Sequence, residues 1–183
     1  TNQEKPFHPL YNYVLITDAR EGLILADINT LADGEPRNNF LTRALTWNEG
    51  GVLNGARAIA VGGRYVYIAA QAGLVVLDLD QPLQPRLLAT LPLQDVRSVV
   101  QQFRYLFVTD ADGLKVIDVS EPAVPKLVAD NVIPMADAQK VFVARTYAYV
   151  AGGREGLYIV DVSTPEKMQL YQKFDDGIVD ARE

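Results

Sequence analysis

One phrase recurs along this chain. It reads "YVYIAAQAGLVVLDLDQPLQP" from Tyr65, "YLFVTDADGLKVIDVSEPAVP" from Tyr105 and "YAYVAGGREGLYIVDVSTPEKM" from Tyr147, with a weaker copy, "YVLITDAREGLILADINTLADGEP", from Tyr13. Each copy holds a Gly-Leu pair and then an aspartate. A repeat of roughly 40 residues restricts the fold to a stack of similar units, because one such unit cannot bury its apolar surface alone.

Each repeat has the pattern of four β-strands. Segments such as "RYVYIAA" and "LVVLDLD" are short, rich in β-branched and aromatic residues, and bounded by Gly or Pro, which is typical of strands. A further strand precedes them ("ARAIAVGG", "VRSVVQQF", "AQKVFVAR"), joined in the first case by a turn at Gly62 and Gly63. A more polar strand follows a proline-containing break ("RLLATLPL", "KLVADNVI", "MQLYQKF").

The fold expected from these strands is an all-β β-propeller with four blade-equivalents of four antiparallel strands. Consecutive residues of "LVVLDL" are apolar, so both faces of each sheet must be covered, as they are between propeller blades. Leu77, Ile117 and Val160 share one column and are expected to be buried there. One domain or propeller sector spans 1–183, with units at about 13–55, 56–94, 95–136 and 137–177, and 178–183 opens a further strand.

The strand order leaves two forms of ring open. The first unit lacks an innermost strand, and Ala181-Arg182 matches the residues that begin such a strand at Ala56-Arg57. That last strand could complete the first blade and close a four-bladed ring without free edges. Alternatively, the chain is a sector of a larger ring of about eight blades, completed by missing blades or by a second copy. We prefer the second interpretation.

The third-strand segments "GLVVLDLDQPLQP", "GLKVIDVSEPAVP" and "GLYIVDVSTPEKM" resemble the LVIVD repeat, and "ARAIAVGGRYVYIA" is similar to the first half of that repeat. The resemblance runs from Tyr13 to Glu183, although the first copy departs from it and is followed by an insertion between Asn29 and Ala56. The resemblance implies a propeller and an exported protein, with an extracellular, cell-surface or periplasmic location. It brings no catalytic residues with it.

Composition removes several functional classes. The formal net charge is −6, with Lys and Arg scattered along the chain, so nucleic-acid binding is not expected. The chain holds no cysteine, which excludes disulfides, thiolate metal ligands and thiol catalysis. No apolar run approaches the roughly 18 to 20 residues of a membrane helix. We expect neither a cofactor nor a metal.

Three other features carry weaker signals. His8 is the only histidine and cannot by itself build a multi-histidine metal site. Asp110 and Asp112 have the D-x-D-G pattern of a calcium loop, but such a loop needs six to eight oxygens, so we interpret it as a hairpin turn. The segment "GGREG" at 152–156 has glycines without the strand-loop-helix context of a phosphate site.

The strongest candidate site is a polar column at the start of each innermost strand. Arg57, Arg97, Gln139 and Arg182 recur in register, and Asp95, Asp137 and Asp180 precede three of them by two positions. Residues i and i+2 of a strand face the same way, so these side chains are expected at the mouth of the propeller channel. They are candidates for binding a small polar ligand or an acidic peptide through paired contacts. Alternatively, they pair between neighbouring blades and hold the ring together.

These observations predict a non-catalytic β-propeller scaffold of an exported or cell-surface protein that mediates protein or glycan interactions. The alternative is an enzyme, a hydrolase or lyase, with a polar site at the channel mouth. The chain offers no cysteine and one histidine, and catalysis needs a base, a nucleophile or a metal in mutual reach. We therefore expect a protein or glycan partner, and self-association where blades are missing.

Overall fold

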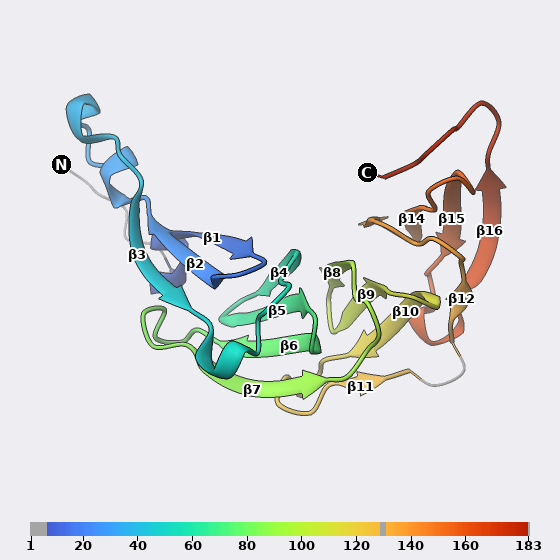
Figure 1. Cartoon of the computed structure of the whole chain (residues 1–183), viewed down its shortest axis with the longest axis horizontal. Helices are drawn as coiled ribbons and strands as arrows, with labels where there is room; N and C mark the ends of the chain where they lie inside the picture. Colours follow the sequence, from blue (N-terminus) through green and yellow to red (C-terminus); the bar gives the residue numbers. More distant parts are fainter. Residues whose placement is uncertain (1–6, 129–130, 183) are drawn as a thin grey trace.

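The computed structural model describes residues 7–128 and 131–182. It consists of four antiparallel sheets that stand side by side along an open arc (Figure 1). Each sheet is built from strands that follow one another in the sequence. We call these sheets blades 1 to 4 in chain order, and they confirm the predicted all-β propeller fold.

The strands occupy the segments that the repeat predicts. Blade 1 holds β1 (Tyr13–Asp18), β2 (Gly22–Asp27) and β3 (Thr42–Trp47). Blade 2 holds β4 (Ala58–Gly62), β5 (Tyr65–Ala70), β6 (Gly73–Asp78) and β7 (Arg86–Leu91). Blade 3 holds β8 (Ser98–Gln102), β9 (Tyr105–Thr109), β10 (Gly113–Asp118), β11 (Lys126–Leu127) and β12 (Ile133–Pro134). Blade 4 holds β13 (Val141–Ala144), β14 (Tyr147–Ala151), β15 (Leu157–Asp161) and β16 (Gln169–Phe174).

Helical structure among the described residues is limited to short 3-10 turns. They are η1 (Pro9–Asn12), η2 (Asn29–Leu31), η3 (Pro36–Asn38), η4 (Glu49–Gly51) and η5 (Pro165–Lys167). No helix within the described ranges has the length and apolar character needed to cross a membrane.

The outer strands depart from the predicted pattern in one blade. Blade 3 was expected to have one outer strand over 126–133, but β11 and β12 are two short strands that both pair with β10. Pro134 in β12 has no N–H to give to the ladder. In the other three blades the outer pairing contains a β-bulge next to the same column, at Leu25/Ala26, Val76/Leu77 and Ile159/Val160. Such bulges add twist to a strand pair.

The core lies between adjacent blades. One cluster joins blades 1 and 2, a second joins blades 2 and 3, and a third joins blades 3 and 4. Leu77, Ile117 and Val160 are all fully buried, which confirms the prediction for that column. Blades 2 and 3 therefore pack with both faces against neighbouring blades.

The recurring aspartate ends the equivalent strand of each blade, β2, β6, β10 or β15, in the same way. Asp27, Asp78, Asp118 and Asp161 each accept, through Oδ1, the backbone N–H two residues further on, at 2.8 to 2.9 Å. This Asx turn directs the chain out of the strand. The recurring aspartate of the repeat therefore has a structural role in all four blades, which is to form this turn.

The last described residues run beside blade 4. Ala181 and Gly153 exchange two backbone hydrogen bonds of 2.8 and 2.9 Å, an isolated bridge at the turn between β14 and β15. A similar contact occurs where the chain passes from blade 1 to blade 2. There the backbone N–H of Gly55 donates to the carbonyl of Ala19, in the turn between β1 and β2, at 2.7 Å. The C-terminal end of the described chain and blade 1 lie on opposite sides of the arc's opening (Figure 1).

Candidate functional site

The predicted polar column begins at the start of the inner strands. Arg57 directly precedes β4 and Arg97 directly precedes β8. Their backbone N–H groups donate to Ala69 and Thr109 at 3.0 and 2.8 Å, and that of Gln139 donates to Ala151 at 2.7 Å. Because the backbone is fixed in the same way in each blade, the side chains emerge at equivalent places.

The arginines of this column reach the aspartate of the next blade. Arg57 Nη1 lies 3.0 Å from Asp95 Oδ1, and Arg97 Nη1 lies 3.1 Å from Asp137 Oδ1. Arg97 also donates to the carbonyl of Ala138 at 2.8 Å, and its side chain is only 21% exposed. Each contact joins two blades that share no backbone ladder.

Contacts within a blade link these pairs into one chain of hydrogen bonds. Asp95 also accepts from Arg97 at 2.8 Å, and Asp137 also accepts from the Gln139 amide. We call the five residues linked in this way the polar row: Arg57, Asp95, Arg97, Asp137 and Gln139. Asp180 and Arg182 form a pair of their own at 2.9 Å.

The electrostatics of the polar row favour the ionised form of the Asp95 carboxyl. The hydrogen bond from Arg97 lowers the pKa of Asp95, and the charges of Arg97 and Arg57 act in the same direction. Charge-assisted hydrogen bonds of this kind are stronger than neutral ones. The row therefore ties blades 2, 3 and 4 together, and its binding of a ligand stays a prediction.

The two aspartates of the D-x-D-G segment form ion pairs with a lysine side chain of the same blade. Lys115 in β10 places Nζ 2.6 Å from Asp110 Oδ2 and 2.6 Å from Asp112 Oδ2. Asp110 is fully buried and Lys115 nearly so. Burial alone would lower the pKa of Lys115, but the hydrogen bonds to the two carboxylates outweigh burial and raise it. The ammonium group thus occupies the place between the carboxylates, in keeping with a hairpin turn.

Sequence reasoning missed Lys115, although a signal was present. Its column holds Val75 in blade 2 and Tyr158 in blade 4, so a lysine there needs a buried partner. The two aspartates three and five positions earlier supply it.

His8 and the "GGREG" segment have structural contacts. His8 Nδ1 accepts the N–H of Leu10 at 3.1 Å and so caps η1. Glu155 accepts from Tyr158 at 2.8 Å, a bond that lowers the pKa of the Glu155 carboxyl. A Cβ on Gly153 would meet Asp137 Oδ2 at 2.1 Å, so glycine is needed for the polar row to lie against this turn.

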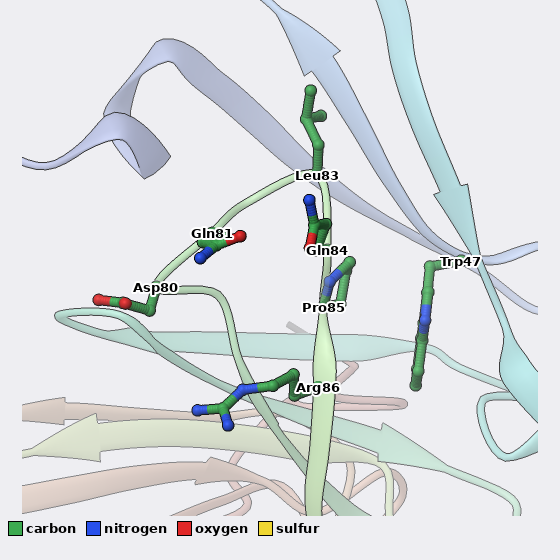
Figure 2. Close-up of a pocket in the computed structure, with 7 residues that line it drawn as sticks. All are labelled: Trp47, Asp80, Gln81, Leu83, Gln84, Pro85 and Arg86. Carbon is green, nitrogen blue, oxygen red and sulfur yellow. The ribbon is translucent and has the colours of Figure 1, made fainter.

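A pocket of about 540 Å³ lies between blades 1 and 2. It is formed by the end of β3 and by the loop between β6 and β7, which Figure 2 shows. The residues that line it are Trp47, Asp80, Gln81, Leu83, Gln84, Pro85 and Arg86. Sequence reasoning missed this pocket, although the only tryptophan lies within the insertion between Asn29 and Ala56.

The repeats, the blades and the ties between them define a β-propeller repeat protein. The LVIVD repeat model matches three consecutive segments, residues 55–90, 95–130 and 136–176. These matches cover more than half of the chain, so the chain belongs to the LVIVD repeat family. The comparison with curated proteins finds no match.

Solved structures share the fold at low sequence identity. AztD from Citrobacter koseri is 13% identical with a TM-score of 0.50, over 93% of this chain and 47% of that chain. Its apo structure is 14% identical with a TM-score of 0.49, over 96% and 48%. A chain of the nidogen/laminin complex is 14% identical with a TM-score of 0.44, over 86% and 79%. The chain spans about half the length of the AztD chain.

Proposed function

We propose that this chain is a non-catalytic propeller scaffold of an exported or cell-surface protein, and that it binds a protein partner at the pocket beside Trp47. The observation that carries the proposal is the pocket itself, which joins an indole to an exposed leucine and an arginine. Tryptophan and arginine are enriched among residues that dominate binding energy. A volume of about 540 Å³ also lies in the usual range for binding sites.

The polar groups of the pocket suit an extended peptide segment. Arg86 is 67% exposed and is oriented by Asp78, whose Oδ2 lies 2.5 Å from NH2. Gln81 and Gln84 add amide donors and acceptors. We expect an apolar partner side chain against Trp47 and an acidic group near Arg86.

The insertion in blade 1 supports a protein partner. Leu31, Phe40 and Leu41 are 52%, 70% and 58% exposed. Thr30 Oγ1 donates to the Phe40 carbonyl at 3.0 Å, which holds the two ends of this loop together. Leu41 directly precedes β3, the strand that ends at Trp47, so apolar surface occurs at both ends of one strand. Exposed apolar groups of this kind are common at interaction sites.

Export is inferred from the family. The LVIVD repeat matches most of the chain, and proteins that carry it are often exported or surface-associated. A propeller scaffold that presents loops at its rim fits such a location.

Support for an enzyme at the channel mouth is weaker. A general acid or base works best with a pKa near the operating pH, whereas the hydrogen bond from Arg97 lowers the pKa of Asp95. Both carboxylates of the polar row are already engaged by Arg or Gln side chains. A paired carboxylate of this kind is better suited to hold blades together than to exchange protons.

The fluorescence of Trp47, the only tryptophan, tests the proposal. Defined peptide and glycan arrays would be probed with the chain, and hits titrated in solution while Trp47 emission is followed. We expect acidic-apolar peptides to bind, and Leu83→Ala to weaken their binding about tenfold, since Leu83 is 48% exposed in the pocket. Val124→Ala is the matched control, because Val124 is 52% exposed in the same loop of blade 3.

Two results would contradict the proposal. One is peptide binding that Leu83→Ala leaves unchanged, which would put the partner elsewhere. The other is binding of glycans alone, which would replace the protein partner with a sugar.

A further inference from the structure

Each blade has two apolar faces with different residues. We call the face toward the next blade in the chain the forward face, and the other the backward face. In blade 3 the forward face consists of Tyr105, Phe107, Leu114 and Val116, all buried in the cluster shared with blade 4. The backward face includes Leu106 and Val108, which are fully buried against blade 2.

Blade 4 leaves its forward face uncovered. The columns that blade 3 buries are occupied there by Tyr147, Tyr149, Leu157 and Ile159, and all four are only partly buried. Phe142 pairs with Tyr149, and Tyr149 pairs with Ile159, so these three form one row across the sheet. The Phe142 side chain is 65% exposed.

The outer strand of blade 4 extends this apolar face. The rings of Tyr147 and Tyr171 pack edge to face with centroids 5.3 Å apart. All six residues of β16 are exposed, Tyr171 at 65%. The forward face of blade 4 thus has the composition of a blade interface without the neighbouring blade.

Blade 1 leaves the β1 part of its backward face exposed, whereas Ile24 and Ala26 of β2 are buried. Val14 and Ile16 in β1 are 41% and 43% exposed. In blade 2 the same two columns hold Val66 and Ile68, and both are fully buried against blade 1. The uncovered face of blade 1 is therefore the kind of face on which the forward face of another blade packs.

We propose that a second copy of this chain covers both faces, with the forward face of blade 4 in one copy packed on the backward face of blade 1 in the other. The pairing repeats the blade contacts already present within the chain. The arc in Figure 1 leaves blades 1 and 4 on either side of its opening, so two copies form two such contacts and close one ring of about eight blades, a size that propellers adopt. The chain shares its fold with AztD and covers 47% of that chain, so a chain about twice as long also adopts this fold.

A test of this pairing uses the full chain and one charged substitution on each face. We expect the unmodified chain to sediment as a dimer at micromolar concentration. Phe142→Glu on the forward face and Ile16→Glu on the backward face should each weaken the dimer at least tenfold. Phe103→Glu is the control, because Phe103 is 88% exposed in a turn of blade 3, away from both faces. Circular dichroism and thermal unfolding would verify that each variant folds.

Mixing the two variants distinguishes this arrangement from one in which each face packs against the same face of the other copy. Head-to-tail pairing leaves one unmodified contact between an Ile16→Glu copy and a Phe142→Glu copy, so the mixture should form dimers that neither variant forms alone. Three results would overturn the proposal: an unmodified chain that stays monomeric, a dimer that Ile16→Glu does not weaken, or assemblies larger than two copies. The first would assign these faces to blades outside this sequence.

Discussion

Arg97 forms ion pairs with two carboxylates, because its guanidinium lies 2.8 Å from Asp95 and 3.1 Å from Asp137. The two aspartates belong to successive connections between blades. Asp95 lies where the chain enters blade 3, and Asp137 lies where it enters blade 4. One side chain therefore fixes the spacing of two inner strands. This contact is the centre of the polar row and the place to test its structural role.

Arg97→Ala should destabilise the fold by about 1 to 2 kcal/mol, since it removes several hydrogen bonds from a side chain that is 21% exposed. Arg182→Ala should have no measurable effect, because Arg182 is 62% exposed and pairs with Asp180 of its own segment. Urea unfolding at pH 7 measures both. Equal midpoints for the two variants would show that the row does not hold the blades.

Asp78→Asn should cost about 1.5 to 3 kcal/mol, the usual range for hydrogen bonds to a charged group. Asp78 is buried, and Arg86 and Arg64 lie 2.5 and 3.4 Å from its carboxylate. Asp161→Asn is the control, because Asp161 ends its strand with the same turn but takes its hydrogen bonds from Ser163. The control should lose less in chemical unfolding.

The effect of Asp78 should also depend on pH. Burial alone would raise the pKa of Asp78, but hydrogen bonds from the Asp80 N–H and Arg86 outweigh it, and the pKa lies below its ordinary value. A depressed carboxyl pKa contributes stability above the unfolded value of about 3.9, and that stability is lost as the pH falls through the folded pKa. The gap between the unmodified chain and Asp78→Asn should thus be full at pH 6 and shrink below about pH 4. A gap that stays constant to pH 2.5 would contradict this assignment.

Lys115→Val should cost about 3 to 5 kcal/mol, because it leaves the buried Asp110 carboxylate without its cation. The double variant Lys115→Val/Asp110→Ala should recover most of this loss, since blade 2 holds Val75 and Ala70 in the same columns. A double-mutant cycle by urea unfolding measures the coupling. Additive losses would mean that the two charges do not depend on each other.

Phe103→Gly should stabilise the fold by about 0.5 to 1 kcal/mol. Phe103 has φ 53 in the turn between β8 and β9, a conformation that costs a non-glycine residue roughly 1 to 2 kcal/mol. Blade 2 places Gly63 with φ 62 at this position. The gain is smaller than the strain because glycine has more freedom in the unfolded chain. The reverse change, Gly63→Ala, should lower the thermal midpoint, and a rise would refute the argument.

Much of the fold could be predicted because apolar residues recur at equivalent positions of each repeat. Leu77, Ile117 and Val160 each lie in the apolar cluster between their own blade and the preceding one, so their burial follows from the repeat. The divided outer strand of blade 3 could not be predicted in this way. Between β11 and β12, Asn131 is buried and accepts the backbone N–H of Met168 at 2.9 Å, a tertiary contact that the repeat does not contain.

The sites were predicted less completely than the fold. The polar row was visible because its members recur, and the structure adds the direction of each pair, such as Arg57 to Asp95. The pocket beside Trp47 does not recur, because it needs the insertion of blade 1 and a loop of blade 2 to approach each other. A feature of this kind depends on a tertiary contact that occurs once, so the repeat in the sequence cannot predict it.

The order of strands within each sheet affects how the protein is made. Every blade is built from one continuous segment of the chain, so its ladder can form as soon as that segment leaves the ribosome or a translocation channel. Its forward face stays bare until the following blade is synthesised, and interactions in such arrays run between nearest neighbours. Folding should therefore proceed from the N-terminal blade onward, with the forward face of the newest blade exposed to chaperones in addition to the exposed part of blade 1.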